Sequence, residues 1–269
     1  MRPLLPSLKV MCTLAIYFQA TRNYPVVIAA NRDEFLARPA DNPTTLAHHP
    51  HVVGGKDLKA GGTWLGINEY GVVAGLLNRR ALEGANPDVR SRGLLCLDAL
   101  RHRSAADAAR FTRAQRGSDY NPFNLLIASR DEAWVAHNRD GAIDMVTLTP
   151  GLHLLTNLDL DDFECPKISR SYSRFARLGE HAEFRRDPVA MQDELGAILA
   201  DHETQLDSRG DRPNGLCLHV DGYGTRSSSL IFLGADPGHV EHWFAPGPPC
   251  KTAYAPAMVP ERAQPESSA

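Results

Sequence analysis

The chain has 269 residues, enough for one large domain or two small ones. Hydrophobic residues make up 43% and charged residues 23%, as in ordinary globular proteins, and no apolar stretch approaches the roughly 18 residues that span a bilayer. The 29 Lys and Arg residues nearly balance the 32 Asp and Glu residues without forming a basic block, so we expect a soluble protein that binds small molecules, not nucleic acid or anionic lipid.

The N-terminal residues 1–10 are interrupted by Pro3 and Pro6, and their apolar run is too short for the core of an export signal. We interpret them as a leader or a misassigned start. A single domain is expected over residues 11–255, followed by a disordered tail over 256–269 that is rich in Pro, Ser and Glu. The sequence thus predicts a cytoplasmic protein, and it says nothing of the oligomeric state.

Two apolar, β-branched runs at residues 12–19 and 25–31 predict a hairpin of buried strands. Residues 32–63 lose this periodicity and are rich in Pro, Gly and His, which predicts a long loop of the kind that often forms the wall or lid of a site. Residues 63–78 then have the pattern of a strand, a turn and a second strand.

The remaining elements alternate between helices and strands. Helices are predicted from Ser91 and from Ser104, where Ser104 and Asp107 resemble a capping pair, and a meander of short strands follows from residue 123. Further helices are expected at 167–182 and 188–203, and closing strands at 216–220, 228–234 and 239–245. This order predicts an α+β fold with largely antiparallel sheets covered by helical layers, and it disfavours a Rossmann fold.

A nucleophile is best sought at Cys12, because the sequence has no GxSxG elbow. The odd number and wide spacing of the cysteines, without a CxxC pair, argue against a disulfide framework and a zinc knuckle. Cys12 directly follows Met11; if that methionine begins the chain and is removed, the free α-amine of Cys12 could serve as the base for its own thiol. The alternative is a small buried residue in the first strand.

Four polar residues, Asn31–Glu34, directly follow the apolar run of the second strand. Charges at the end of a buried strand form either a solvated turn or a site on a rigid scaffold. Trp64 follows paired glycines, so it either lines a pocket or is a core aromatic residue.

Five motifs in order, MC, NRDE, GGTWLG, LTN and YGTRSSS, resemble the NRDE family, also called the transport and Golgi organisation protein 2 family, from Met11 to about residue 245. That family is similar to N-terminal nucleophile hydrolases of the choloylglycine hydrolase and penicillin V acylase type. The resemblance implies a four-layer αββα sandwich with two mainly antiparallel sheets.

The resemblance also implies roles for individual residues. Cys12 would be the nucleophile, Arg32 would lie beside its sulfur and favour the thiolate, and Asp33 would hold the α-amine. Asn157 and Asn78 would form the oxyanion hole. Asn31, Glu34 and Trp64 are the expected pocket residues, and a Ser-Arg-Phe context adds Arg174 to the catalytic set. The chain departs from the family at Glu164–Lys167, where Pro-Trp-Pro-Lys is usual.

Other polar clusters carry weaker signals. His48, His49 and His51 could bind a metal or haem, but the composition around them favours a solvated loop. The second NRD triplet, at 138–140, precedes Gly141 and predicts a hairpin turn. The motif at 223–226 precedes a strand and is read either as a family motif without a chemical role or as a turn.

Taken together, the sequence and its resemblance predict a hydrolase that cleaves a carbon–nitrogen amide or related acyl bond through a thioester at Cys12, without a cofactor. The rival hypothesis is a non-catalytic carrier or chaperone for haem, lipid or an acyl thioester, since a shared fold does not decide function.

Overall fold

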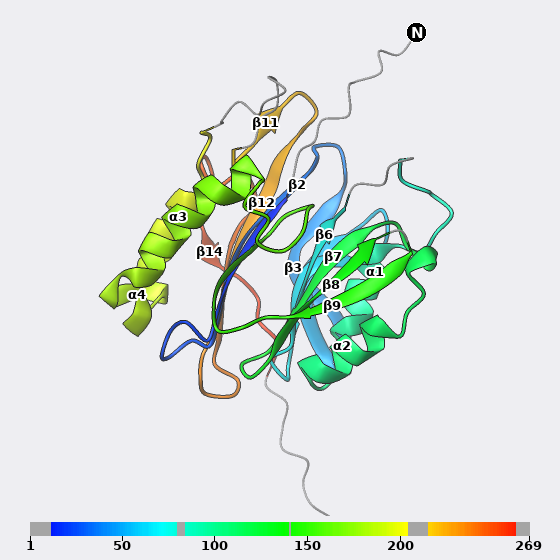
Figure 1. Ribbon diagram of the computed structural model, residues 1–269, viewed down its shortest axis with the longest axis horizontal. Coiled ribbons are helices and arrows are strands. Elements are labelled where there is room, and N and C mark those ends of the chain that lie inside the picture. Colours follow the sequence, from blue (N-terminus) through cyan, green and yellow to red (C-terminus); the bar gives the residue numbers. More distant parts are fainter. Residues whose placement is uncertain (1–11, 80–83, 140, 204–214, 262–269) are drawn as a thin grey trace, which may run out of the picture.

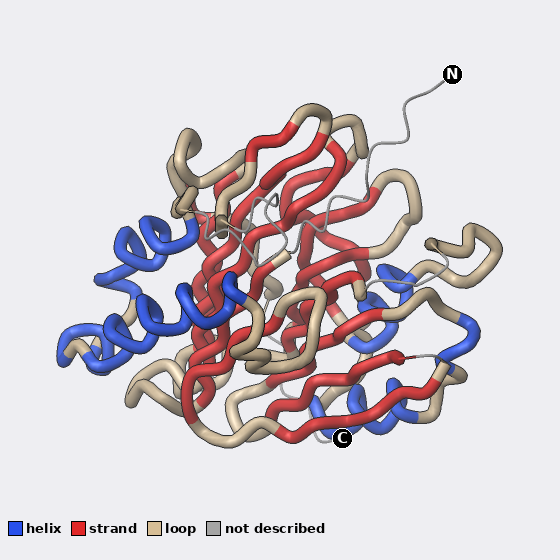
Figure 2. Tube along the Cα trace, turned by 45° about the horizontal axis from the view of Figure 1, so that its top comes forward, coloured by secondary structure: helices blue, strands red, loops and turns tan. Residues whose placement is uncertain are grey.

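Two seven-stranded antiparallel sheets lie face to face in the computed structural model, with helices on the outer face of each (Figure 1). The structure describes residues 12–79, 84–139, 141–203 and 215–261. From a second direction the helices again lie on opposite outer sides of the strands (Figure 2). This arrangement confirms the αββα sandwich that the resemblance implied.

The first sheet has the strand order β10-β1-β2-β12-β13-β14, with β11 beside β12. Its strands are β1 (Thr13–Phe18), β2 (Val26–Phe35), β10 (Gly151–Leu155), β11 (His219–Val220), β12 (Tyr223–Leu233), β13 (Val240–Ala245) and β14 (Ala255–Pro256). The predicted hairpin is confirmed, because β1 and β2 pair with Thr13 opposite Asn31. β2 therefore lies in the middle of this sheet, between β1 and β12.

The second sheet follows the chain in an unbroken meander, β3 to β9. Its strands are β3 (Ala40–His48), β4 (His51–Asp57), β5 (Thr63–Asn68), β6 (Val73–Asn78), β7 (Phe123–Ala128), β8 (Ala133–Arg139) and β9 (Ala142–Thr147). Gly141 has a φ of +84°, which suits the tight turn predicted between β8 and β9.

Helices cover the outer face of each sheet. The helices α1 (Arg92–Ala99) and α2 (Ala105–Arg113) pack on the second sheet, and α3 (Pro166–Glu180), α4 (Ala182–Arg186) and α5 (Gln192–Leu199) pack on the first. Short 3-10 turns lie at Gly117–Asp119 and Val189–Met191. The predicted cap of α2 is confirmed, since the Ser104 side chain accepts a hydrogen bond from the backbone N–H of Asp107.

Strict alternation along the central strands builds two separate cores. On β1, Ala15 and Tyr17 face the helices α3–α5, whereas Leu14 and Ile16 face the second sheet. β2 repeats the pattern, and Ile28 packs between the sheets. Because both faces of these strands are buried, Leu14–Phe18 and Val26–Ala29 are apolar at every position and not only at alternate ones.

Residues 40–57 form the strands β3 and β4, so the prediction of one long loop over 32–63 was wrong. β3 is an edge strand that is mostly exposed or half-buried, and it contains Pro43, which only an edge strand tolerates well. Such an edge strand buries no continuous face, so its sequence does not alternate regularly between apolar and polar residues. His48 and His51 lie at the ends of these strands, beside the turn that joins them.

Two further elements differ from expectation. β10 leaves the meander and pairs with β1 in the other sheet, with Leu155 opposite Leu14. Near the C-terminus, Ala255–Pro256 pairs with β13, and the N–H of Ala257 donates to the carbonyl of His242 at 2.7 Å, although a disordered tail was predicted from residue 256. The interpretations of residues 1–10 and 262–269 lie outside the described residues.

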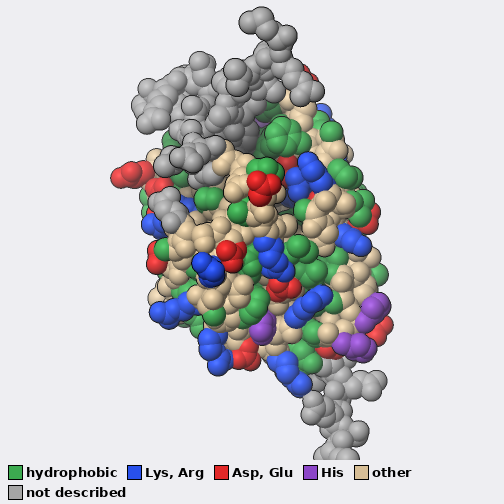
Figure 3. Space-filling model, turned by 90° about the vertical axis from the view of Figure 1, so that its right-hand side faces the viewer, with side chains coloured by type: hydrophobic (Ala, Val, Ile, Leu, Met, Phe, Trp, Pro, Cys, Tyr) green, Lys and Arg blue, Asp and Glu red, His purple; other side chains and the backbone are tan. Residues whose placement is uncertain are grey.

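The surface mixes charges of both signs. On the face shown in Figure 3, basic and acidic side chains are interspersed among polar and apolar ones. Among the helices of the described residues, none combines the length and apolar character needed to cross a membrane.

The core between the sheets should carry much of the stability. Ile28 is fully buried there, so Ile28→Ala is expected to lower the free energy of unfolding by about 2–5 kcal/mol. Val146→Ala is the matched control, because Val146 on β9 is 39% exposed and its truncation should change that free energy by less than about 0.5 kcal/mol. Urea unfolding of both variants measures this, and equal losses would contradict the assigned core.

Candidate active site

The polar end of β2 divides its four side chains between two environments. Asn31 points to the helical layer, where its Nδ2 donates to the carbonyls of Leu199 and Leu216 at 2.8 and 2.9 Å. Asp33 also points to that side, whereas Arg32 and Glu34 face the second sheet. The alternation of the apolar part of β2 thus continues through its polar end.

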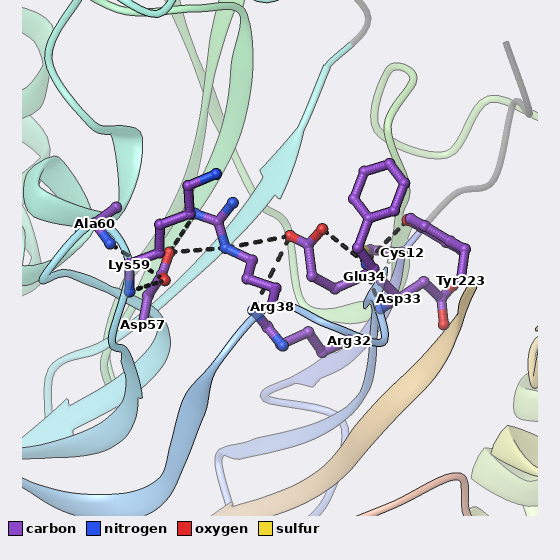
Figure 4. A network of polar contacts seen from close by, with 10 residues as sticks. Cys12, Arg32, Asp33, Glu34, Arg38, Asp57, Lys59, Ala60 and Tyr223 are labelled. Atoms are coloured by element: carbon purple, nitrogen blue, oxygen red, sulfur yellow. Dashed lines mark hydrogen bonds and ion pairs between the residues drawn. The ribbon is translucent and has the colours of Figure 1, made fainter. Parts of the chain in front are cut away.

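Cys12 lies immediately before β1, beside the polar end of β2. Its thiol donates to the carbonyl of Asp33 at 3.4 Å, and its Sγ accepts from the N–H of Asp33 at the same distance. The hydroxyl of Tyr223 donates to the same Asp33 carbonyl at 2.9 Å. These contacts hold the half-buried sulfur against the backbone of β2 (Figure 4).

The Asp33 carboxyl group is buried with two partners from distant parts of the chain. Thr225 on β12 donates to its Oδ1 at 2.7 Å, and Lys167 on α3 places its ammonium 3.7 Å from Oδ2. Burial raises the pKa of Asp33 to about 6, and the charge of Lys167 and the hydrogen bond from Thr225 oppose that shift. Burial likewise lowers the pKa of Lys167.

Arg32 makes its contacts on the opposite face. Its guanidinium carbon lies 4.1 Å from the centroid of the Trp64 ring on β5, and its Nη2 lies 4.0 Å from Glu34. Arg38 continues this chain of charges, 3.7 Å from Glu34 and 2.5 Å from Asp57 (Figure 4). The two sheets are therefore joined at this end by stacked and paired charges.

The surroundings of the thiol favour its neutral form. Burial and the nearby Asp33 raise the pKa of Cys12 to about 12, and the expectation that Arg32 favours the thiolate stays a prediction. Its sulfur is therefore protonated near neutral pH while the nitrogen of Cys12 remains in a peptide bond. A base is needed before this sulfur can attack.

A cavity of about 450 Å³ opens between the sheets beside these residues. It is lined by Cys12, Arg32, Glu34, Trp64 and Asn78, together with Asn31 and Asp33. The volume suits a small organic ligand, because such sites commonly occupy roughly 300–1,000 Å³.

Arg92, the first residue of α1, adds a cation to the cavity wall. It donates to the carbonyl of Pro122 at 2.8 Å and forms no salt bridge within the described residues, while the charge of Glu34 on the same cavity wall acts on it from further away. Burial lowers its pKa to about 10, so it stays charged at neutral pH. An anionic group of a ligand could therefore pair with it.

Asn157 follows β10, two residues beyond Leu155. Since Leu155 pairs with Leu14, the register continued by two residues brings Asn157 opposite Cys12. Asn124 of the second sheet holds this segment by donating to the carbonyls on either side of Asn157, Thr156 at 2.7 Å and Leu158 at 2.5 Å. The Oδ1 of Asn157 is buried and makes no hydrogen bond to the described residues.

Arg174 is not brought to this cavity. It lies on α3 and pairs with Asp201 at 3.0 Å, on the helical side of the first sheet. Sequence reasoning missed Lys167, Thr225 and Asn124 as parts of the site. The YGTRSSS motif was a signal for Thr225, and the departure from the family at Glu164–Lys167 drew attention to the segment with Lys167 but not to its charge.

Solved structures with this architecture define the class of fold. The chain has a TM-score of 0.54 with penicillin V acylase from Agrobacterium tumefaciens, at 14% identity, covering 91% of this chain and 84% of the acylase. The Caenorhabditis elegans ortholog of N-acylethanolamine-hydrolyzing acid amidase gives 0.53 at 14% identity, covering 85% and 94%. The chain therefore shares the αββα fold of this acylase and this amidase.

The particular family follows from sequence. The profile of the Transport and Golgi organisation 2 family matches residues 11–243, and the chain belongs to that family. It is 32% identical over 242 residues to the Transport and Golgi organization protein 2 homolog of Bos taurus, covering 81% of this chain and 84% of the relative.

Removing the ammonium beside Asp33 should strongly destabilise the fold. Both side chains are almost fully buried, so Lys167→Met leaves an uncompensated carboxylate and should lower the free energy of unfolding by about 3–5 kcal/mol. The double variant with Asp33→Asn should recover part of this loss, as chemical unfolding can measure. Strictly additive effects of the two substitutions would contradict a direct interaction.

The raised pKa of Asp33 predicts a pH dependence of stability. Between pH of about 4 and about 6 the folded chain binds more protons at this carboxyl group than the unfolded chain, whose pKa is near 3.8. The contribution of Asp33 to stability is therefore greatest at low pH and falls as the pH rises through that window. Asp33→Asn should remove this part of the slope of unfolding free energy against pH.

The matched control for that slope is Asp131→Asn, at an exposed position. It shows what the same substitution does when the carboxyl group lies at the surface and not beside Lys167. A wild-type slope that Asp33→Asn does not alter would show that this carboxyl group is ionised equally in both states.

Proposed function

We propose that the chain is an N-terminal-cysteine hydrolase that cleaves an amide or related acyl bond, with Cys12 as the first residue of the active form. The observation that carries this proposal is the sulfur of Cys12, fixed by the backbone of Asp33 at the wall of a ligand-sized cavity. The fold shared with an acylase and an amidase supports it.

The proton transfers and bond changes of the reaction use the thiol and α-amine of Cys12, the substrate and water. The free α-amine of Cys12 takes the thiol proton, and the sulfur attacks the carbonyl carbon of the substrate. When the carbon–nitrogen bond breaks, the protonated amine returns its proton to the leaving nitrogen, and the acyl group stays on sulfur as a thioester. Water then attacks the thioester, releases the acid and restores the thiol.

Asn157 and Asn78 are the proposed oxyanion donors. Asn157 is held opposite Cys12 by the contacts of Asn124, and Asn78 lines the cavity at the end of β6. Each would donate a side-chain N–H to the oxygen that becomes negative when sulfur attacks. Loss of one such donor lowers kcat by about 10²–10³ in hydrolases that use it.

The charge of the cavity wall narrows the substrate class. Arg92 is a cation on the cavity wall that forms no salt bridge within the described residues, Glu34 on the same wall acts on it from further away, and Trp64 offers an apolar face. We propose an acylated compound that also carries an anionic group, such as an N-acyl amino acid, with the anion paired to Arg92. The acid or amine released depends on the rest of the substrate.

A carrier is the second candidate, and one observation favours it. The pKa of Cys12 is raised to about 12, so a chain in which the nitrogen of Cys12 stays in a peptide bond has an unreactive thiol beside the cavity. Such a chain could hold an acyl thioester, a lipid or haem without turning it over.

Turnover of N-acyl amino acids and of neutral N-acyl amides distinguishes these functions. The chain that begins at Cys12, checked by intact mass, should hydrolyse the anionic compounds, whereas the full chain and Cys12→Ala should not. Arg92→Gln should raise the KM for anionic substrates by about tenfold or more and leave that for neutral amides unchanged.

The control for the cysteine is Cys96→Ala, since Cys96 is buried in α1 away from the cavity and its removal should preserve activity. Saturable binding of the same compounds without hydrolysis, unaffected by Cys12→Ala, would refute the hydrolase and support the carrier. Equal KM changes for both substrate types in Arg92→Gln would refute the anion contact.

A further inference from the structure

Four potential metal ligands lie close together beside the first sheet, on the side to which the Asn31 side chain points. They are His202 after α5, Cys217 and His219 around the start of β11, and Cys250 in the turn after β13. One ligand atom from each residue lies within 4.8 Å of the corresponding atom of every other. Three separate segments of the chain therefore converge on one point.

The spacing of these atoms matches a tetrahedral zinc site. The two sulfurs are 3.5 Å apart, and Nε2 of His219 lies 3.2 Å from Cys250 Sγ and 3.9 Å from Cys217 Sγ. A tetrahedral ion with Zn–S near 2.3 Å and Zn–N near 2.0 Å separates two sulfurs by about 3.8 Å, and a sulfur from a nitrogen by about 3.5 Å. Small shifts would suffice to seat the ion.

The second imidazole is already oriented for binding. Nδ1 of His202 lies 2.9 Å from the carbonyl oxygen of Cys217 and donates its proton there, which leaves Nε2 as the bare nitrogen. A backbone carbonyl or carboxylate in this role accompanies nearly all metal-bound histidines. The N–H of Cys217 in turn donates to the carbonyl of Asp201 at 2.9 Å, so the two segments are fixed to each other.

We propose that His202, Cys217, His219 and Cys250 form a structural zinc site. Two thiolates and two neutral imidazoles are the ligand set that zinc prefers, and four protein ligands close the coordination sphere, so the ion would have no position for a substrate. Binding releases the two thiol protons to the solvent, and the resulting site is electrically neutral. The site lies apart from the cavity between the sheets, because none of its ligands lines that cavity.

A metal ion at this site would affect the polar end of β2. The carbonyl of Leu216, next to Cys217, accepts from Asn31, and the N–H of Leu218 donates at 2.9 Å to the hydroxyl of Thr225 that holds Asp33. Zinc would fix the backbone of residues 216–218 and so the partners of both side chains. It would stabilise the candidate active site without touching it.

Metal content of the reduced, purified full chain tests the proposal. Elemental analysis should find one zinc ion per chain, and exchange for Co²⁺ should give the visible d–d bands and sulfur-to-cobalt charge transfer of a tetrahedral site with two thiolates. Cys250→Ser should weaken zinc binding by more than about 100-fold, because it removes a direct ligand. Chelation should lower the Tm, and added Zn²⁺ should restore it.

Cys96→Ala is the matched cysteine control and His49→Ala the histidine control, and both should keep the full zinc content. The cobalt spectrum uses the unaltered chain, so it decides the question even if Cys250→Ser does not fold. Absence of a thiolate–cobalt spectrum, zinc binding that survives Cys250→Ser, or a Cys217–Cys250 disulfide in protein isolated without oxidant would overturn the proposal.

Discussion

The burial of a charged carboxylate at the end of a central strand is the constraint on which this structure depends. β2 is covered on both faces, yet it continues from apolar residues into Asn31–Glu34 without leaving the sheet. Each of these side chains must find a partner, because an unpaired buried charge costs several kcal/mol. Lys167 and Thr225 supply the partners of Asp33, and through them α3 and β12 are fixed to β2.

The same constraint sets the chemistry of Cys12. Its sulfur lies against the backbone of Asp33 in surroundings that favour the neutral thiol, and the cation next to it in sequence, Arg32, is engaged with Trp64 and Glu34. Reactivity would therefore depend on a proton acceptor within bonding reach of the sulfur, and the α-amine of Cys12 is such a group. On this account, release of that α-amine converts the unreactive thiol of Cys12 into a nucleophile, and the rest of the site changes little.

Sequence alone predicted the elements that bury a continuous face and the residues that belong to ordered motifs. The hairpin β1–β2 and the cap at Ser104 follow from local patterns, and the family resemblance carried by the motifs implied the αββα layers. β3 was not predicted, because an edge strand buries no regularly spaced set of apolar residues.

Lys167 was not predicted as part of the site, because its partner Asp33 is more than a hundred residues away and a salt bridge of that kind leaves no local signal in the sequence. The cluster around Cys217 escaped for the same reason, since its ligands come from converging segments. Arg174 was nominated from a three-residue context, which is too short to fix its place in space.

The most direct measurement is the intact mass of the protein as it accumulates in its own cells, together with the sequence of its first peptide. A mass that begins at Cys12, with an unmodified α-amine, is the result that this account predicts. Active protein in which residues before Cys12 remain attached would contradict it, because the sulfur would then lack the base that the proposed acyl transfer requires.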